Sequence, residues 1–168
     1  MDQYIKSRFK YSAYLLAFPT VLFAVYSLVL FFQNIKSGEI PVVFLIPIST
    51  FWVFVWIWMF FGDMRTKVIS VEIMSDSIKV KRYLGLGYTK AYLLDSITGF
   101  KISIIQSKMG SYEYLYLMIG NRKIAKLSEF YHSNYKELKG NIISLGIKGL
   151  GTEIFSNRQE FKDIFSKT

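Results

Sequence analysis

The pattern of apolar and polar positions divides the chain into an apolar front part and an alternating rear part. Two runs without charged side chains, Tyr11 to Ile35 and Ile40 to Gly62, are separated only by the short polar stretch Gln33 to Glu39. As helices they would measure about 34 to 38 Å at about 1.5 Å per residue, enough to cross a hydrocarbon core of about 30 Å. The pattern predicts an integral membrane protein with a transmembrane helical hairpin over residues 11–62 and a loop at 33–39.

A cleaved signal peptide is the alternative interpretation of the first run. That run is longer than the apolar part of a signal peptide, and a second run follows it at once. The transmembrane hairpin is therefore the better interpretation.

Most cations next to the two runs lie at the same end of the predicted hairpin: Lys6, Arg8, Lys10, Arg65 and Lys67. The connecting loop carries only Lys36, against Glu39. Cytoplasmic flanks of membrane helices are enriched in lysine and arginine. We therefore expect both termini, including residues 1–10, to lie in the cytoplasm of a bacterial inner membrane and the loop to lie outside.

From residue 64 onward, apolar positions alternate with polar ones, as in strands with one buried face. Ile69, Val71 and Ile73 show this alternation first, and Gly120-Asn121 is the kind of two-residue turn that closes a tight hairpin. We expect about six strands in antiparallel meander order, closed or nearly closed on themselves to remove their edges.

After the strands the apolar spacing becomes helical, with a stripe formed by Tyr135, Leu138, Ile142 and Ile143. Asn134 with Glu137 resembles a capping box, and Gly146 marks the expected end of the helix. We expect residues 147–168 to form a Gly-rich link and a short terminal helix.

Two membrane helices followed by such strands and a helix resemble bacterial membrane proteins with a pleckstrin-homology-like (PH-like) domain. The residues that carry the resemblance are Val68-Ile-Ser-Val-Glu-Ile73, Ser75-Asp-Ser77, Tyr92-Leu-Leu-Asp-Ser-Ile97 and Leu127-Ser-Glu-Phe130, followed by Asn134-Tyr-Lys-Glu-Leu138. The resemblance implies an α+β membrane protein whose PH-like β-barrel or sheet, with a C-terminal helix, covers residues 64–146. It implies a binding or regulatory module and brings no catalytic motif with it.

A second resemblance is architectural only. Antiphage effectors of the CBASS type join two transmembrane helices to a small β-barrel that binds a cyclic nucleotide and drives oligomerisation. For this chain it implies an alternative function, a nucleotide-gated effector whose helices permeabilise the inner membrane. The helix after the strands fits the PH-like domain better.

Charge adds a candidate partner to this picture. The formal net charge is +9, with 21 Lys and Arg against 12 Asp and Glu, and nearly all of the excess lies after residue 64. Anionic lipid attracts a tethered cationic domain by up to about 1 kcal/mol per well-placed cation. The positive charge of the domain would also attract nucleic acid, but the membrane tether favours lipid as the partner.

The cations predicted to gather at one hairpin are Lys79, Lys81, Arg82 and Lys90. We expect them to bind an anionic headgroup, a protein or a small anionic ligand such as a nucleotide. A solvated charged face is the alternative. Tyr112, Tyr114 and Tyr116 share one face of a predicted strand, either as sheet packing or as a stacking wall for a base or sugar.

Small residues recur every three or four positions of the first run: Ala13, Ala17, Thr20, Ala24 and Ser27. Such a stripe lets another helix approach closely. The partner is either the second run or the same stripe of another subunit, which would make a homo-oligomer.

Side chains suited to catalysis or metal binding are scarce. The chain has no cysteine and one histidine, His132, which comes just before the predicted helix. We therefore expect no enzymatic activity, no cofactor and no metal site, and we interpret His132 as a surface or capping residue.

Overall fold

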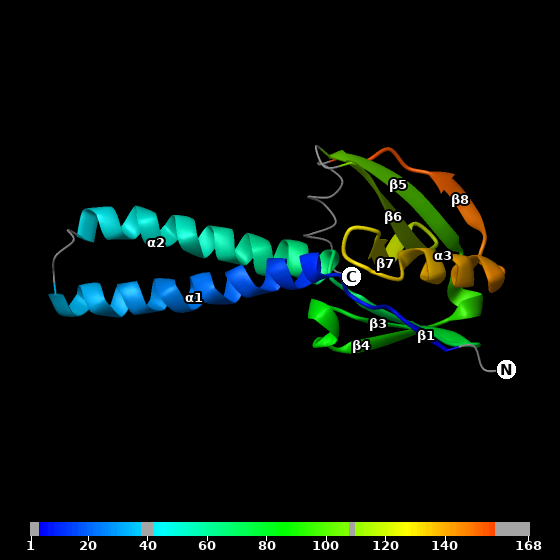
Figure 1. Ribbon diagram of the computed structural model, residues 1–168, viewed down its shortest axis with the longest axis horizontal. Coiled ribbons are helices and arrows are strands. Elements are labelled where there is room, and N and C mark those ends of the chain that lie inside the picture. Colours follow the sequence, from blue (N-terminus) through cyan, green and yellow to red (C-terminus); the bar gives the residue numbers. More distant parts are fainter. Residues whose placement is uncertain (1–3, 38–41, 108–109, 157–168) are drawn as a thin grey trace.

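The computed structural model describes residues 4–37, 42–107 and 110–156. Two long helices extend from one end of a β-domain (Figure 1). Helix α1 covers Tyr11–Ser37, and α2 covers Val42–Ile57 and continues directly into the π-helix η1, Trp58–Met64. The two helices run antiparallel side by side, and the rings of Phe23 and Trp52 stack with their centroids 4.5 Å apart.

Among the described residues, Tyr11–Asn34 of α1 is the one helical stretch long and apolar enough to cross a membrane, with a mean hydropathy of 2.3. The apolar stretch Ser49–Gly62 is shorter. Large side chains such as Phe18 and Phe32 are exposed along α1. A helix that is apolar around its exposed surface needs an apolar surrounding, which makes α1 a candidate membrane span. The helix also continues through Gln33–Ser37, where a loop was expected, while residues 38–41 lie outside the described part.

The β-domain contains two four-stranded sheets. The first is antiparallel, in the order β1 (Ile5–Lys6), β2 (Ser70–Ile73), β3 (Ser77–Lys81) and β4 (Thr89–Leu93). The second has the order β7 (Arg122–Ser128), β6 (Gly110–Ile119), β5 (Gly99–Ser107) and β8 (Gly149–Thr152), with β8 parallel to β5. Short 3-10 turns, η2 (Tyr83–Gly85) and η3 (Leu94–Ser96), flank β4, and helix α3 covers Tyr135–Ser144. The fold is therefore α+β, as predicted.

The hydrophobic core lies between the two sheets and α3, and its fully or almost fully buried members include Val71, Ile73, Ile78, Leu115, Leu117, Leu127, Leu138 and Ile142. The alternating pattern supplies these residues from one face of each strand. Burial of each such side chain stabilises the fold by about 1.5 to 3 kcal/mol. Helix α3 contributes the apolar stripe that the sequence predicts.

Residues before the first helix belong to the β-domain. Ile5 pairs with Ile73 and Lys6 pairs with Glu72, so that β1 adds an edge strand to β2. The chain thus forms one strand, leaves through α1, and returns through α2 to form the next strand of the same sheet. The sequence predicts residues 1–10 only as a cytoplasmic segment, because its cations indicate orientation and two strand residues carry no readable alternation.

The ends of α3 are built differently from each other. Gly146 has φ +76° and its N–H donates to the Ile143 carbonyl at 3.0 Å, which is the expected helix stop. Asn134 stands at the N-cap position but its side chain caps no helical N–H. Its Oδ1 instead accepts the Arg8 N–H at 2.8 Å, and its Nδ2 donates to the Lys6 carbonyl at 3.0 Å. Asn134 therefore anchors the segment after β1.

The expected Gly-rich link after α3 contains the short strand β8. The predicted terminal helix within 147–168 falls mainly on residues 157–168, which lie outside the described part.

A second group of apolar residues, the junction cluster, joins α1 to the β-domain. Its buried members are Ala13, Val68 and Tyr131, and Phe9, Leu16, Leu84 and Phe130 pack against them. The Ser12 hydroxyl donates to the Phe130 carbonyl at 2.7 Å, and the Lys10 N–H donates to the Tyr131 carbonyl at 2.7 Å. The first turn of α1 is therefore fixed to the β-domain by both packing and hydrogen bonds.

Candidate anion-binding pocket

An open pocket of about 390 Å³ lies at the point where β1 leads into α1. Its cations are Lys6, Arg8 and Lys81, its hydroxyl groups come from Ser7, Tyr14 and Ser70, and Phe9, Leu84 and Gly85 complete the lining. Three cations and three hydroxyl groups around one open volume can bind an anion such as a phosphate or a carboxylate.

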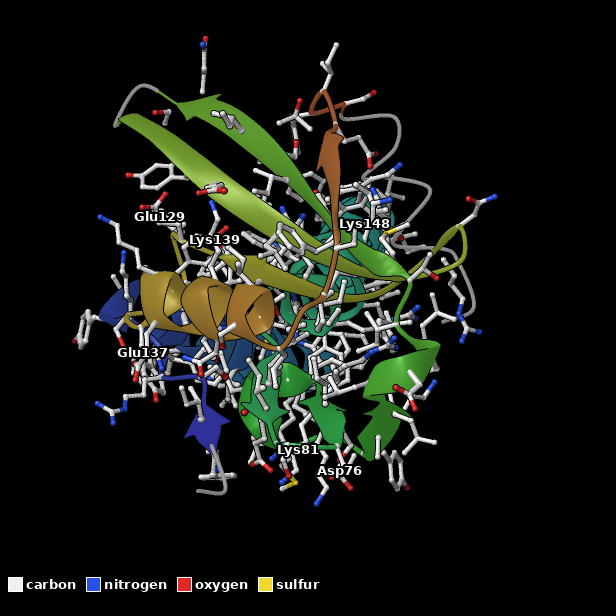
Figure 2. All side chains as sticks on the ribbon, turned by 90° about the vertical axis from the view of Figure 1, so that its right-hand side faces the viewer. Asp76, Lys81, Glu129, Glu137, Lys139 and Lys148 are labelled. Atoms are coloured by element: carbon white, nitrogen blue, oxygen red, sulfur yellow. The ribbon has the colours of Figure 1, made fainter. Side chains whose placement is uncertain are left out.

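Strand pairing explains why the polar residues share one surface. Residues directly opposite each other in neighbouring strands point to the same face. Lys6 is opposite Glu72, and Ser70 is opposite Lys81. The intervening residues of β2 and β3 face the core, so these polar residues lie on the outer face of the first sheet. Figure 2 shows Lys81 on the side of this sheet away from α3.

A carboxylate lies between two of the cations. The Glu72 Oε1 is 3.1 Å from the Lys6 Nζ and 3.5 Å from the Lys81 Nζ. Burial alone would raise the pKa of the Glu72 carboxyl, but the hydrogen bonds and charges of Lys6 and Lys81 outweigh burial and hold this pKa below its usual range. Glu72 is therefore ionised at neutral pH and positions both ammonium groups.

The remaining cation, Arg8, is held by its backbone. Its N–H donates to Asn134, and its carbonyl accepts the N–H of Ser133 at 2.8 Å. Within the described residues the Arg8 guanidinium has no ion pair, and its side chain is exposed. One carboxylate against three cations leaves the pocket with an excess of positive charge.

The hydroxyl groups of the two serines are fixed by the sheet. The Ser7 Oγ accepts the Val71 N–H at 2.9 Å and donates to the Ser70 Oγ at 3.4 Å. Both side chains are buried at the floor of the pocket. They add polar groups at fixed positions beneath the cations.

Of the four cations expected to form one cluster, only Lys81 lines this pocket. Lys79 shares the face of Lys81 but lies two positions earlier in β3. Lys90 is opposite Val80 and so points to the other face of the sheet. Arg82 is partly buried, and burial, followed by the nearby charge of Arg65, lowers the pKa of its guanidinium.

In the sequence, Lys6 and Arg8 indicate only the orientation of the helices and are not predicted to belong to a site. Their contribution depends on the pairing of β1 with β2, which joins residues far apart in the chain. The cation triplet just before the first apolar run was the available signal.

The predicted tyrosine wall is covered by lysine side chains. The Lys126 Nζ lies 4.1 Å from the ring centroid of Tyr114, and the Lys123 Nζ lies 4.1 Å from that of Tyr116. The Tyr112 ring meets the Phe130 ring edge-on at 4.9 Å. Two of the three rings thus take part in cation–π packing, and a base could stack on them only after displacing the lysines.

The expectation that His132 is a surface or capping residue is wrong. Its side chain is fully buried, its Nε2 lies 2.8 Å from the Ile69 carbonyl oxygen, and its Nδ1 lies 3.1 Å from the Ser128 backbone nitrogen. The Phe9 ring packs against it with centroids 5.4 Å apart. The residues that bury the imidazole come from distant parts of the chain.

The small-residue stripe of α1 has two environments. Ala13 is buried in the junction cluster, so this end of the stripe packs against the β-domain. Ala24 and Ser27 are partly buried between exposed neighbours. The side chains of Ala17 and Thr20 lie outside the described part of the structure.

Comparison of the chain with protein-family models, curated proteins and solved structures finds no match. The candidate site therefore depends on the geometry of this chain alone.

Proposed function

We propose that this protein is a membrane-anchored, non-enzymatic binding module at the cytoplasmic face of a bacterial inner membrane. In this proposal the pocket of Lys6, Arg8 and Lys81 binds the anionic headgroup of a lipid. The observation that carries the proposal is the position of the pocket. It lies where β1 leads into α1, and Tyr14 of α1 is part of its lining.

The pairing of β1 with β2 supports a transmembrane hairpin. Paired strands must lie on the same side of a membrane, so the chain between Lys6 and Ser70 crosses it an even number of times. If α1 spans the membrane, α2 together with η1 must return the chain. These two elements contain 16 and 7 residues, enough to approach the thickness of a hydrocarbon core of about 30 Å.

The β-domain supports the PH-like assignment through its order of elements. Strands β2 to β7 follow one another in two sheets, and α3 then packs Leu138 and Ile142 into the core. Two strands differ from the expected pattern, because β1 comes from before the membrane helices and β8 runs parallel to β5.

Lipid is the favoured ligand because the anchor holds the pocket next to the headgroups. A membrane tether raises the local concentration of headgroups around the domain without any further contact. Cytoplasmic leaflets also carry a negative surface potential that favours a cationic site. A soluble nucleotide presents phosphate of the same chemistry, and it is the ligand that the effector alternative requires.

The test uses the full chain in detergent, with short-chain phosphatidylglycerol and phosphatidylcholine added in turn. Binding to the folded state raises the thermal unfolding midpoint as ligand concentration rises. We expect phosphatidylglycerol to raise the midpoint more than phosphatidylcholine, and added salt to weaken the effect because it screens exposed charges. Cyclic nucleotides and inorganic phosphate form separate arms.

Arg8→Gln should remove most of the difference between the two lipids, because Arg8 has no ion pair among the described residues to lose. Lys136→Gln is the matched control, since Lys136 is exposed on α3 and lies outside the pocket lining. If phosphatidylglycerol shifts the unfolding midpoint equally in Arg8→Gln and Lys136→Gln, the proposed site is wrong. The same holds if phosphatidylglycerol and phosphatidylcholine shift the midpoint of the unaltered protein equally. Stabilisation by a nucleotide in the absence of anionic lipid would favour the gated effector.

A further inference from the structure

The connection between β3 and β4 exposes two large side chains. Leu86 is 88% exposed and Tyr88 is 97% exposed. Single exposed apolar residues are common on protein surfaces. These two are notable because their connection lies at the end of the β-domain that faces the two long helices.

Figure 1 places η2 at the end of the first sheet that faces α1 and α2. Both helical elements contact it. Leu84 packs against the junction cluster, which contains Ala13 of α1, and the Tyr83 ring stacks on the Phe60 ring of η1 with centroids 4.9 Å apart. The β3–β4 connection is thus attached to the chain at the point where it leaves the β-domain and at the point where it returns.

The backbone of this connection is constrained. Tyr83 and Leu84 have φ values of 53° and 57°. This is the left-handed backbone conformation, which residues other than glycine rarely adopt. The Leu84 N–H donates to the Val68 carbonyl at 2.9 Å, and the Gly87 N–H donates to the Arg82 carbonyl at 3.0 Å. Strained backbone of this kind persists where the surrounding contacts fix it and is concentrated at functional sites. Here the two hydrogen bonds and the packing of Tyr83 and Leu84 hold the segment that carries Leu86 and Tyr88 in one conformation.

We propose that Leu86 and Tyr88 enter the interfacial layer of the leaflet that surrounds the start of α1. The β-domain then contacts the bilayer through this connection as well as through its two helices. Tyrosine favours the boundary between headgroups and hydrocarbon, and leucine gains by leaving water. The neighbouring Lys90 is exposed and carries the charge that attracts anionic headgroups. The inference depends on the proposed membrane anchor and names a contact separate from the anion pocket.

The chain has no cysteine, so one introduced cysteine carries a fluorescent label at a single position. Leu86→Cys and Tyr88→Cys are labelled with an environment-sensitive dye in the full chain, reconstituted into vesicles that contain phosphatidylglycerol. Ser75→Cys is the matched control, because Ser75 is exposed in the turn at the opposite end of β3. Lipids with a spin label on the upper acyl chain should quench the dye at positions 86 and 88 several-fold more strongly than at position 75.

The tryptophans of the second helical segment, Trp52, Trp56 and Trp58, test the anchor in the same vesicles. If they are quenched while the dyes at positions 86, 88 and 75 respond equally, the bilayer contact of the β3–β4 connection is wrong and the anchor stands. If the tryptophans also escape quenching, the anchor itself is wrong. Quenching at positions 86 and 88 should not depend on the protein-to-lipid ratio. Weak quenching that rises as this ratio is lowered would show that these residues contact a second copy of the chain instead.

Discussion

The Nε2 atom of His132 lies 2.8 Å from the carbonyl oxygen of Ile69, across 63 positions of the sequence. Ile69 lies between η1 and β2, and His132 follows β7. A neutral imidazole that carries its proton on Nε2 donates to Ile69 and accepts the Ser128 N–H on Nδ1. The histidine therefore joins the returning chain to the second sheet.

Stability should depend on pH through His132. Burial lowers the pKa of the imidazole below its ordinary value of 6.5, so the folded state resists protonation. The contribution of His132 is fully present above pH 6.5 and is lost as pH falls from 6.5 through the lower folded-state pKa. The free energy of unfolding of the full chain in detergent, measured between pH 8 and about pH 5, should fall over this window.

His132→Gln separates this effect from other titrations. The variant should lose about 1 to 3 kcal/mol at neutral pH, because buried backbone partners lose their hydrogen bonds. It should also lose the slope below pH 6.5. An unchanged slope in the variant would assign the pH dependence to another group.

Asn134→Ala should loosen the segment after β1, because it removes the hydrogen bonds to Arg8 and Lys6. We expect a loss of roughly 1 to 2 kcal/mol in unfolding free energy and faster amide exchange at residues 5–9. Asn121→Ala, at the exposed β6–β7 turn, is the control and should leave exchange at residues 5–9 unchanged. Slow exchange in Asn134→Ala would show that strand pairing alone holds β1.

Glu72→Gln should strengthen binding of anionic lipid, in contrast to Arg8→Gln. The substitution removes the carboxylate that neutralises Lys6 and Lys81 and keeps a polar side chain in its place. We expect a several-fold lower Kd for phosphatidylglycerol and a steeper dependence on salt, measured by titration of the full chain. Weaker binding in Glu72→Gln would mean that Glu72 aids binding by positioning the ammonium groups of Lys6 and Lys81, and that this outweighs its neutralisation of their charge.

Ala24→Leu tests the small-residue stripe. Ala24 is partly buried, and a larger side chain would hold a closely packed helix away. If the stripe packs against α2, the variant should insert and have a lower unfolding midpoint with an unchanged number of subunits. Val25→Leu, on the exposed side of α1, should change neither property. Loss of crosslinked oligomers in Ala24→Leu alone would assign the stripe to an interface between subunits.

Orientation can be measured with two single-cysteine variants in intact cells. Ser37→Cys, at the far end of α1, should react with a membrane-impermeant thiol reagent. Ser75→Cys, in the β-domain, should not react until the cells are opened. The reverse pattern would place the β-domain outside the cell.

The parts of the fold that the sequence predicts correctly depend on local patterns. Alternation identifies strands such as β2 and β3, and helical spacing identifies α3 with its stop at Gly146. Strand β1 escapes this approach because two residues define no period. Its partner is also separated from it by both long helices.

The same limit applies to the site. Lys81 could be singled out because it lies in a clearly alternating strand, but its companions Lys6 and Arg8 join it only through the β1–β2 pairing. His132 was misjudged for a similar reason, since Phe9 and Ile69 cover it from distant parts of the chain.

The position of β1 has a consequence for biosynthesis. During synthesis β1 leaves the ribosome before the helices and β2 leaves after them, so the first sheet can be completed only once both helices have been made. If insertion stops after one crossing, β1 and β2 are left on opposite sides of the bilayer, and the edge of β2 and the imidazole of His132 stay uncovered. If α1 and α2 cross a membrane as proposed, this sheet can form only when β1 and β2 lie in one compartment, and a chain that crosses once would present an unfinished domain to the proteases of the cell.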